Sequence, residues 1–198
     1  MSAIDDDTAA EGGLLLGRYR LSAKVGAGAS GAVYRGFDEL ERRAVAVKRV
    51  ALSRAEPGLA ERVRREIEIL EAVEHPRVVR LLDHDVAAGG RHLELVFEWL
   101  EGRDLGAWAE SPRSLRDALL VGAQAAEGLA AVHAAGVVHR DVKPGNLFVL
   151  DGETLDVRII DFGVATRSRR LDGLTRAGAI LGTPSYMAPE QFHDTRSV

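Results

Sequence analysis

Two short runs of the sequence carry residue types that together could handle a phosphoryl group. Residues 139–146 read His-Arg-Asp-Val-Lys-Pro-Gly-Asn and place a carboxylate, an ammonium group and an amide on one stretch. Residues 161–163 read Asp-Phe-Gly and add a second carboxylate before a glycine. Phosphoryl transfer needs a carboxylate near the attacking hydroxyl, a cation beside the phosphate and oxygen ligands for Mg²⁺. The two runs therefore contain the groups that such a transfer requires.

A glycine-rich run, Gly26-Ala-Gly28-Ala-Ser-Gly31-Ala-Val33, lies closer to the amino terminus. Glycines allow a backbone to turn sharply and to approach a phosphate closely. The pattern alone is weak evidence, because dinucleotide-binding folds use a similar one. In those folds the glycines lead into a helix, whereas here they lead into a Val-Tyr-Arg segment that favours a strand. The alternative interpretation is an ordinary hairpin turn.

The elements that must position these runs can be read from the periodicity of apolar residues. A loop at Pro57 and Gly58 precedes a helix in which Val63, Ile67 and Leu70 recur at helical spacing. The flanking strands are rich in β-branched residues or bounded by turn residues. These strands are predicted over residues 19–25, 32–37, 43–50, 78–83 and 92–99. We expect a small, mostly antiparallel sheet with one helix.

The character of the sequence changes after Gly102. The Ala- and Leu-rich segment from residue 115 to residue 135 predicts a long helix that ends near Gly136. Short strands are predicted over residues 147–150 and 157–160. The residues expected to share the buried face of the long helix are Leu119, Ala123, Ala126, Ala130 and His133.

Composition excludes several classes of protein. The 198 residues have a net charge of −4, which gives no support to nucleic acid as the main partner. Cysteine is absent and the histidines form no HxxxH pair, so disulfides, thiolate catalysis and a zinc site are all disfavoured. No apolar run approaches the length of a membrane span. Residues 1–13 are expected to form a disordered acidic tail and not a secretory signal, so a cytoplasmic protein is expected.

The order of these runs resembles that of eukaryotic-like (Hanks-type) bacterial serine/threonine protein kinases. The resemblance extends from Leu16 to Gln191 and includes Ala-Val-Ala-Val-Lys at residues 44–48 and Gly-Thr-Pro-Ser-Tyr-Met-Ala-Pro-Glu at residues 182–190. It implies an α+β, bilobal protein-kinase-like fold. A complete, β-rich N-lobe would span residues 14–101, and a partial, helical C-lobe would span residues 102–198. The helices that follow Glu190 in such kinases are missing from this sequence, so an incomplete C-lobe is expected.

The resemblance also implies roles for five catalytic residues. Lys48 would hold the α- and β-phosphates of ATP, and Glu66 would orient Lys48 by an ion pair. Asp141 would accept or orient the proton of the attacking hydroxyl, and Lys143 would neutralise the transferred group. Thr183 would hydrogen-bond near Asp141 and help to position the substrate hydroxyl.

The same resemblance implies a binding site for ATP and Mg²⁺. Asn146 and Asp161 would be the metal ligands. Phe97 would close the back of the nucleotide site. The hinge between the lobes would lie near residues 98–102, and backbone groups of residues 98–100 would hydrogen-bond adenine. The residues implied in nucleotide binding are Val25, Gly26, Gly28, Gly31, Val33, Ala46, Lys48, Glu98, Leu100, Asp104 and Phe148.

Lys143, two places after the catalytic acid, resembles the serine/threonine branch of the kinases. Thr175 and Ser168 are the candidate phosphorylation sites, since a phosphate there could pair with Arg140. Each could equally be a solvated loop hydroxyl. His139 is expected to be structural and to pack under Phe162.

Two functional readings remain open at this point. The first is a serine/threonine kinase, with a role in signalling, whose partners are ATP and a protein substrate. The second is a non-catalytic kinase remnant that binds a nucleotide or another protein. A homodimer is a possible assembly in either case.

Overall fold

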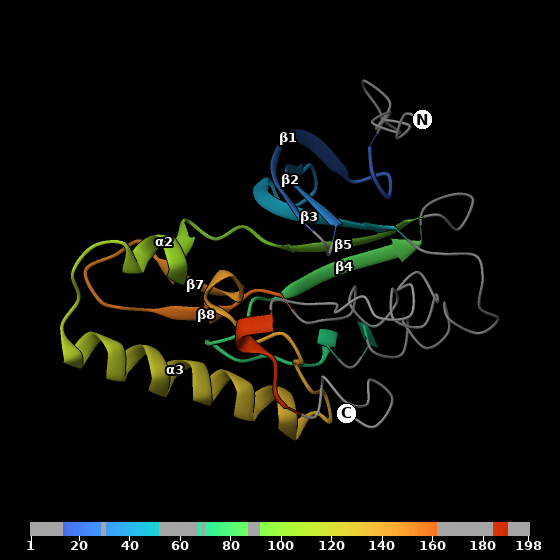
Figure 1. Cartoon of the computed structure of the whole chain (residues 1–198). Coiled ribbons are helices and arrows are strands. Elements are labelled where there is room, and N and C mark those ends of the chain that lie inside the picture. The colour runs from blue at the N-terminus through green and yellow to red at the C-terminus, as the bar shows by residue number, and fades with distance from the viewer. Residues whose placement is uncertain are drawn as a thin grey trace, which may run out of the picture.

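The computed structural model describes residues 14–28, 31–51, 67–68, 70–86, 92–161 and 184–189. Its larger sheet has five strands in the order β1-β2-β3-β5-β4, and every neighbouring pair is antiparallel. In Figure 1 this sheet lies above a second, smaller sheet and the long helix α3. The strands of the larger sheet are β1 (Tyr19–Gly28), β2 (Gly31–Asp38), β3 (Arg43–Ala51), β4 (Leu81–Val86) and β5 (His92–Glu98).

The five-stranded sheet forms because alternate residues of its strands are apolar. Val45 and Val47 of β3 are both fully buried on one face, where they pack with Tyr19 and Val96. Lys48 comes next in the strand, so its side chain emerges on the opposite face. The period of two along β3 thus directs this lysine toward the second half of the molecule.

The smaller sheet pairs β6 (Gly102–Asp104) with β7 (Leu147–Leu150) and β7 with β8 (Val157–Ile159). Two α-helices follow β6 in the chain, α2 (Leu105–Ala109) and α3 (Leu115–Ala134). The short helices η1 (Pro144–Asn146) and η2 (Pro184–Tyr186) complete the described elements. The strands β7 and β8 were predicted closely, whereas β6 and α2 were not predicted.

Helix α3 begins and ends at residues whose side chains and backbone explain its limits. Ser114 and Asp117 form a capping box at its start. Gly136 has a φ of +81°, and the N–H of Val137 reaches back to the carbonyl of Val132 at 3.1 Å. A left-handed residue just past the last turn is a common helix terminator, and glycine adopts it without strain. The predicted end near Gly136 is confirmed.

The buried face of α3 is not the one expected from the sequence. Leu119 is 65% exposed, and the four other residues predicted to be buried with it are also exposed. The helix instead buries Val121, Ala125, Gly128 and Val132. Both stripes have helical spacing and small or apolar side chains, so periodicity alone does not distinguish them. The choice is made by the packing partner, since α3 lies against β8.

Strand β4 starts at Leu81 and not at the predicted Val78. The preceding residues turn toward the second sheet, where Val78 forms an isolated parallel bridge with Ile159. The N–H of Val79 donates to Ile159 O, and the N–H of Ile159 donates to Arg77 O, both at 2.9 Å. Backbone pairing with β8 therefore competes successfully with extension of β4.

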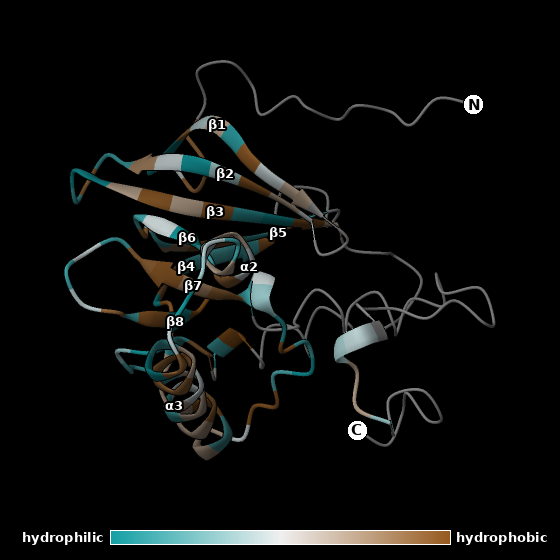
Figure 2. Cartoon of the chain, turned by 60° about the vertical axis from the view of Figure 1, so that its left-hand side comes forward, coloured by the Kyte–Doolittle hydropathy of each residue, from teal (hydrophilic) through white to brown (hydrophobic). Residues whose placement is uncertain are grey.

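The main hydrophobic core joins the two sheets and α3. It contains residues of β3, β4 and β5 together with residues of α3, β7 and β8. Figure 2 shows hydrophobic residues on β7, which lies between the larger sheet and α3. No helix in the described residues is long and apolar enough to cross a membrane. Residues 1–13, predicted to form an acidic tail, lie outside the described residues.

Candidate active site

A cavity of about 520 Å³ lies between the five-stranded sheet and the smaller sheet. Its roof comes from β1, β2 and β3, its floor from η1 and β7, and one side from the hinge, residues 98–102. Of the residues predicted to bind a nucleotide or metal, those that line it are Val25, Gly26, Gly31, Val33, Ala46, Lys48, Glu98, Leu100, Asn146, Phe148 and Asp161. Phe97, predicted to close the back of the site, also lines it. The fold therefore gathers residues 136 positions apart in the chain, from Val25 to Asp161, around one space.

The polar end of the cavity contains an ion pair between the two sheets. Lys48 Nζ lies 2.5 Å from Asp161 Oδ1. The side chain of Lys48 is 9% exposed and that of Asp161 is 19% exposed. Because the pair is largely shielded from water, each charge is compensated mainly by the other and by groups close by. An anionic ligand here would meet one fixed cation, and a metal ion would meet one fixed carboxylate.

The loop at residues 139–146 holds the Asp141 carboxylate beside this cavity. Lys143 Nζ donates to Asp141 Oδ2 at 2.7 Å, and Asn146 Nδ2 donates to the same oxygen at 2.9 Å. Asn146 Nδ2 also donates to the Asp141 backbone carbonyl at 2.7 Å. Asn146 is the last residue of η1, and its backbone carbonyl accepts a hydrogen bond from the N–H of Ile160 at 3.0 Å. Three side chains that are close in sequence thus form one hydrogen-bonded group.

The residues that precede Asp141 set the course of this loop. His139 is 2% exposed, and its Nδ1 accepts the N–H of Asp141 at 3.3 Å. Burial lowers the pKa of His139, while the negative charges of Asp161 and Asp141 act in the opposite direction. Arg140 has a φ of +64°, a left-handed conformation that is uncommon for residues other than glycine. A strained residue of this kind is found where a loop must present a neighbouring side chain in a fixed direction.

Four predicted site residues in the described part of the chain do not line the cavity. Asp141 and Lys143 lie beside it, joined to Asn146, which does line it. Gly28 is the last residue of β1. Asp104 is the N-cap of α2, where its Oδ1 accepts the N–H of Ala107 at 3.0 Å. Residues that lie outside the described part are Glu66, Thr183, Thr175 and Ser168, together with Phe162, which was expected to cover His139.

Several residues line the cavity without having been predicted there. Two of them, Val79 and Ile160, are apolar. Ile160 directly precedes Asp161, so its place at the cavity could have been predicted from the sequence. Val79 has no comparable signal, because its place depends on the hydrogen bond from its N–H to Ile159 O. The other unpredicted lining residues are Ala27, Glu101, Gly102 and Gly145.

The donor set at the polar end is suited to a hard cation held partly by the protein. Asn146 and Asp161 both line the cavity, and the Asn146 side chain uses its amide nitrogen in its two hydrogen bonds to Asp141. Its amide oxygen can therefore serve as a ligand. Magnesium is commonly bound by one or two side-chain oxygens with the rest supplied by phosphate and water. Within the described residues, no group of three or more His, Asp or Glu side chains forms a self-sufficient metal site.

Comparisons with known proteins agree with this geometry. A model described as the protein kinase domain matches residues 19–197. The chain is 39% identical over 193 residues to the serine/threonine-protein kinase pkn2 of Myxococcus xanthus, covering 93% of this chain and 23% of that protein. It is 40% identical over 183 residues to the DNA damage-responsive serine/threonine-protein kinase RqkA of Deinococcus radiodurans, covering 91% of this chain and 27% of that protein.

A solved structure shows the same similarity in three dimensions. The crystal structure of Rad53 1-466 in complex with AMP-PNP aligns with a TM-score of 0.72 and 25% identity, covering 89% of this chain and 43% of that chain. The chain spans about a quarter of the length of the two curated relatives.

Proposed function

Because this chain belongs to the protein kinase domain family, we propose that it transfers the terminal phosphoryl group of ATP to a serine or threonine hydroxyl of a protein substrate. One observation carries the proposal. The Asp141 carboxylate is bonded to both Lys143 and Asn146, and Asn146 reaches into the cavity that holds Lys48 and Asp161. A base, a cation and two metal-binding groups are therefore adjacent, as phosphoryl transfer requires.

In this function the apolar part of the cavity receives adenine and the polar part receives the phosphates. Val33 and Ala46 cover the adenine from the roof, and Phe148 supports it from the floor. Lys48 binds the phosphate oxygens. Asp104, whose Oδ1 also caps α2, is the proposed contact to the ribose. Glu66, outside the described residues, remains the proposed partner that orients Lys48.

Asp141 is the proposed base because hydrogen bonds from Lys143 and Asn146 fix the position of its carboxylate. Lys143 holds one carboxylate oxygen at 2.7 Å and is placed to neutralise charge on the transferred group. Asn146 and Asp161 would hold Mg²⁺, which supplies positive charge to the phosphate oxygens when bound. Thr183 is proposed to position the substrate hydroxyl. The residues present fit an ATP–magnesium complex without any further metal ligand.

The choice of serine or threonine as acceptor rests on Lys143 and on the relatives. Both curated relatives described above are named serine/threonine-protein kinases. Those names do not favour the alternative, a non-catalytic remnant that binds a nucleotide or a protein. Phosphorylation of Thr175 or Ser168, a cytoplasmic location and a homodimer remain predictions from the sequence.

Phosphotransfer from γ-labelled ATP tests the proposal directly. The full chain is incubated with Mg-ATP and casein, and labelled residues in casein and in the chain itself are identified after acid hydrolysis. We expect label on serine or threonine, and Asp141→Asn is expected to lower the rate by at least about 100-fold. The Asp141 variant should still bind ATP, because Asp141 does not line the cavity.

Two results would contradict the proposed function. Label that appears only on tyrosine would make the acceptor assignment wrong. An Asp141→Asn variant as active as the wild-type chain would make the assigned base wrong. If the chain binds Mg-ATP but transfers no phosphate, the remnant interpretation is supported instead.

A further inference from the structure

The hinge, residues 98–102, must present its backbone to adenine in one conformation, and side chains from both sheets contact it. Glu98, Trp99 and Leu100 all line the cavity. A backbone segment that moved freely would have to be ordered at the moment of binding, at a cost in affinity. The contacts that hold the hinge therefore bear on how tightly a nucleotide binds.

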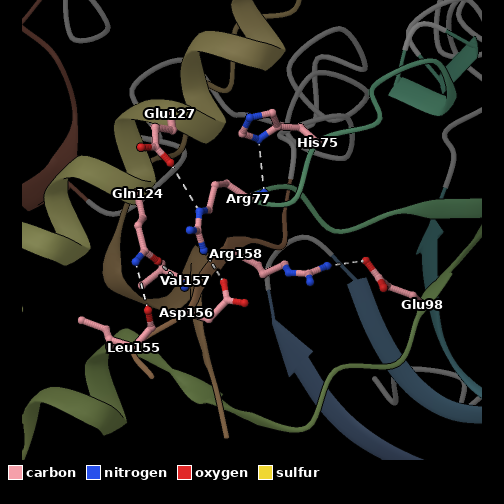
Figure 3. A network of polar contacts seen from close by, with 9 residues as sticks. All are labelled: His75, Arg77, Glu98, Gln124, Glu127, Leu155, Asp156, Val157 and Arg158. Atoms are coloured by element: carbon pink, nitrogen blue, oxygen red, sulfur yellow. Dashed lines mark hydrogen bonds and ion pairs between the residues drawn. The ribbon is translucent and has the colours of Figure 1, made fainter. Parts of the chain in front are cut away.

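Glu98 is held from the side of the smaller sheet. Arg158 Nη1 lies 3.1 Å from Glu98 Oε1, and the two side chains are 22% and 28% exposed. The same oxygen accepts the N–H of Arg80 at 2.9 Å, and the N–H of Glu98 donates to Arg80 O at 3.0 Å. Figure 3 shows Arg158 and Glu98 reaching toward one another. Arg158 is on β8, three residues before Asp161.

Trp99 is held from the side of the larger sheet. The Arg35 guanidinium of β2 lies 5.0 Å from the centroid of the Trp99 ring. The Trp99 indole N–H donates to Glu101 Oε1 at 2.7 Å. Arg35 pairs across the sheet with Ala46, which lines the cavity roof. Two consecutive hinge residues are thus contacted by an arginine from each half of the fold.

Stability alone is a poor reason for an arginine at position 158. Arg158 Nε is buried and has no hydrogen-bond partner in the described part of the chain. A buried polar atom that stays unsatisfied costs free energy, and an ion pair that is 22% and 28% exposed contributes little net stability, so an apolar residue of similar size can replace the arginine without loss of stability. The contact with Glu98 is the feature that an apolar residue could not reproduce.

We propose that Arg158 and Arg35 are positioning residues that hold Glu98 and Trp99 in the conformation that binds adenine. This inference rests on the proposed function, because it assumes a nucleotide in the cavity. The two arginines contact the hinge and not the ligand. Their removal lets the hinge populate other conformations, and the apparent affinity falls in proportion to the fraction of molecules that remain competent to bind.

Binding of adenosine, which has the base but no phosphates, provides the test. Calorimetric titrations compare the full wild-type chain with Arg158→Met and Arg35→Gln. We expect each variant to bind adenosine about three- to tenfold more weakly, and ATP more weakly by the same factor. The melting temperature of the ligand-free Arg158→Met variant should equal or exceed that of the wild-type chain, which a purely structural role would not give.

Two other arginines serve as matched controls. Arg77 makes an ion pair with Asp156 at 2.5 Å and is 23% exposed, but it joins α3 to the entry of β8 and not to the hinge (Figure 3). Arg113 stacks on Trp108 at 4.0 Å, and neither residue lines the cavity. Arg77→Met and Arg113→Gln should leave adenosine affinity unchanged.

The outcomes separate this inference from the proposed function. Adenosine affinities in Arg158→Met and Arg35→Gln that equal the wild-type value would overturn the inference and leave the proposed function intact. An equal loss of adenosine affinity in Arg77→Met and Arg113→Gln would also overturn the inference, since removal of any of these arginines would then have the same effect. A wild-type chain that binds neither adenosine nor ATP would overturn both.

Discussion

Lys48 illustrates how a single residue can serve both the folded chain and its ligand. Its side chain is 9% exposed and lies 2.5 Å from Asp161. Lys48→Met keeps most of the apolar stem and removes the charge. Phosphotransfer should be lost in this variant because the cation proposed to hold the α- and β-phosphates is removed, whereas adenosine should bind as before. Rate measurements and adenosine titrations check both parts, and a variant that still transfers phosphate at the wild-type rate would contradict the assigned role.

His139 predicts a dependence of stability on pH. Burial lowers the pKa of His139 in the folded chain below its value of about 6.5 in the unfolded chain. At pH values between the folded and the unfolded pKa of His139, the unfolded chain binds more protons than the folded chain. The free energy of unfolding therefore rises with pH in that range, and it falls as the pH drops below about 6.5. Urea unfolding at pH values from about 7.5 to about 5 measures this change in the free energy of unfolding.

A His139→Gln variant should lose this part of the pH dependence, because glutamine does not titrate. His133→Gln, on the exposed side of α3, controls for the loss of a histidine as such. If the free energy of unfolding changes with pH as steeply in His139→Gln as in the wild-type chain, another group is responsible.

At the scale of the element, α3 contains two glycines in opposite surroundings. A Cβ at Gly128 would lie 2.9 Å from both Arg77 O and Ile159 Cδ1, whereas a Cβ at Gly122 would have no atom within 4 Å. Gly128→Ala should destabilise the fold by about 1–3 kcal/mol because the helix must move away from β8. Gly122→Ala should stabilise it by about 0.5–1 kcal/mol, since alanine loses less entropy in a helix.

Denaturant unfolding of the two variants measures the difference. Both variants make the same chemical change in the same helix. Changes of opposite sign in the free energy of unfolding would therefore be due to the close packing around Gly128. Equal effects at both positions would mean that α3 does not lie as close to Arg77 and Ile159 as described.

At the scale of the whole molecule, a ligand in the cavity should stabilise both halves of the fold together. The cavity is lined by both sheets, so a nucleotide binds only when they are assembled. A ligand at about 100 times its Kd adds about 2.7 kcal/mol. For a chain of this size that raises the melting temperature by about 5–10 °C.

A thermal melt with and without Mg-ATP measures this shift. Magnesium without nucleotide is the control for a general effect of the cation, and Lys48→Met should show a smaller shift with Mg-ATP. A melting temperature that does not respond to Mg-ATP would contradict a nucleotide site in the cavity.

The sequence alone determined the features that depend on neighbours in the chain. Residues 139–146 lie close together whatever surrounds them, so the grouping of Asp141, Lys143 and Asn146 was predictable from their spacing. The pairing of β2 with β3 and the end of α3 at Gly136 were predictable for the same reason, because each depends on local turns and local periodicity.

Only the tertiary structure decided the features that depend on a distant partner. The structure shows that the Asp104 carboxylate is the N-cap of α2, a role that the sequence analysis did not foresee, while its contact with a ligand stays a prediction. The buried face of α3 was predicted wrongly because two stripes are equally apolar, and contact with β8 selects one of them. The contact between Arg158 and Glu98 joins residues 60 positions apart. Such contacts form when two surfaces of the folded chain fit together, and the pattern of residues along the sequence does not show which surfaces will meet.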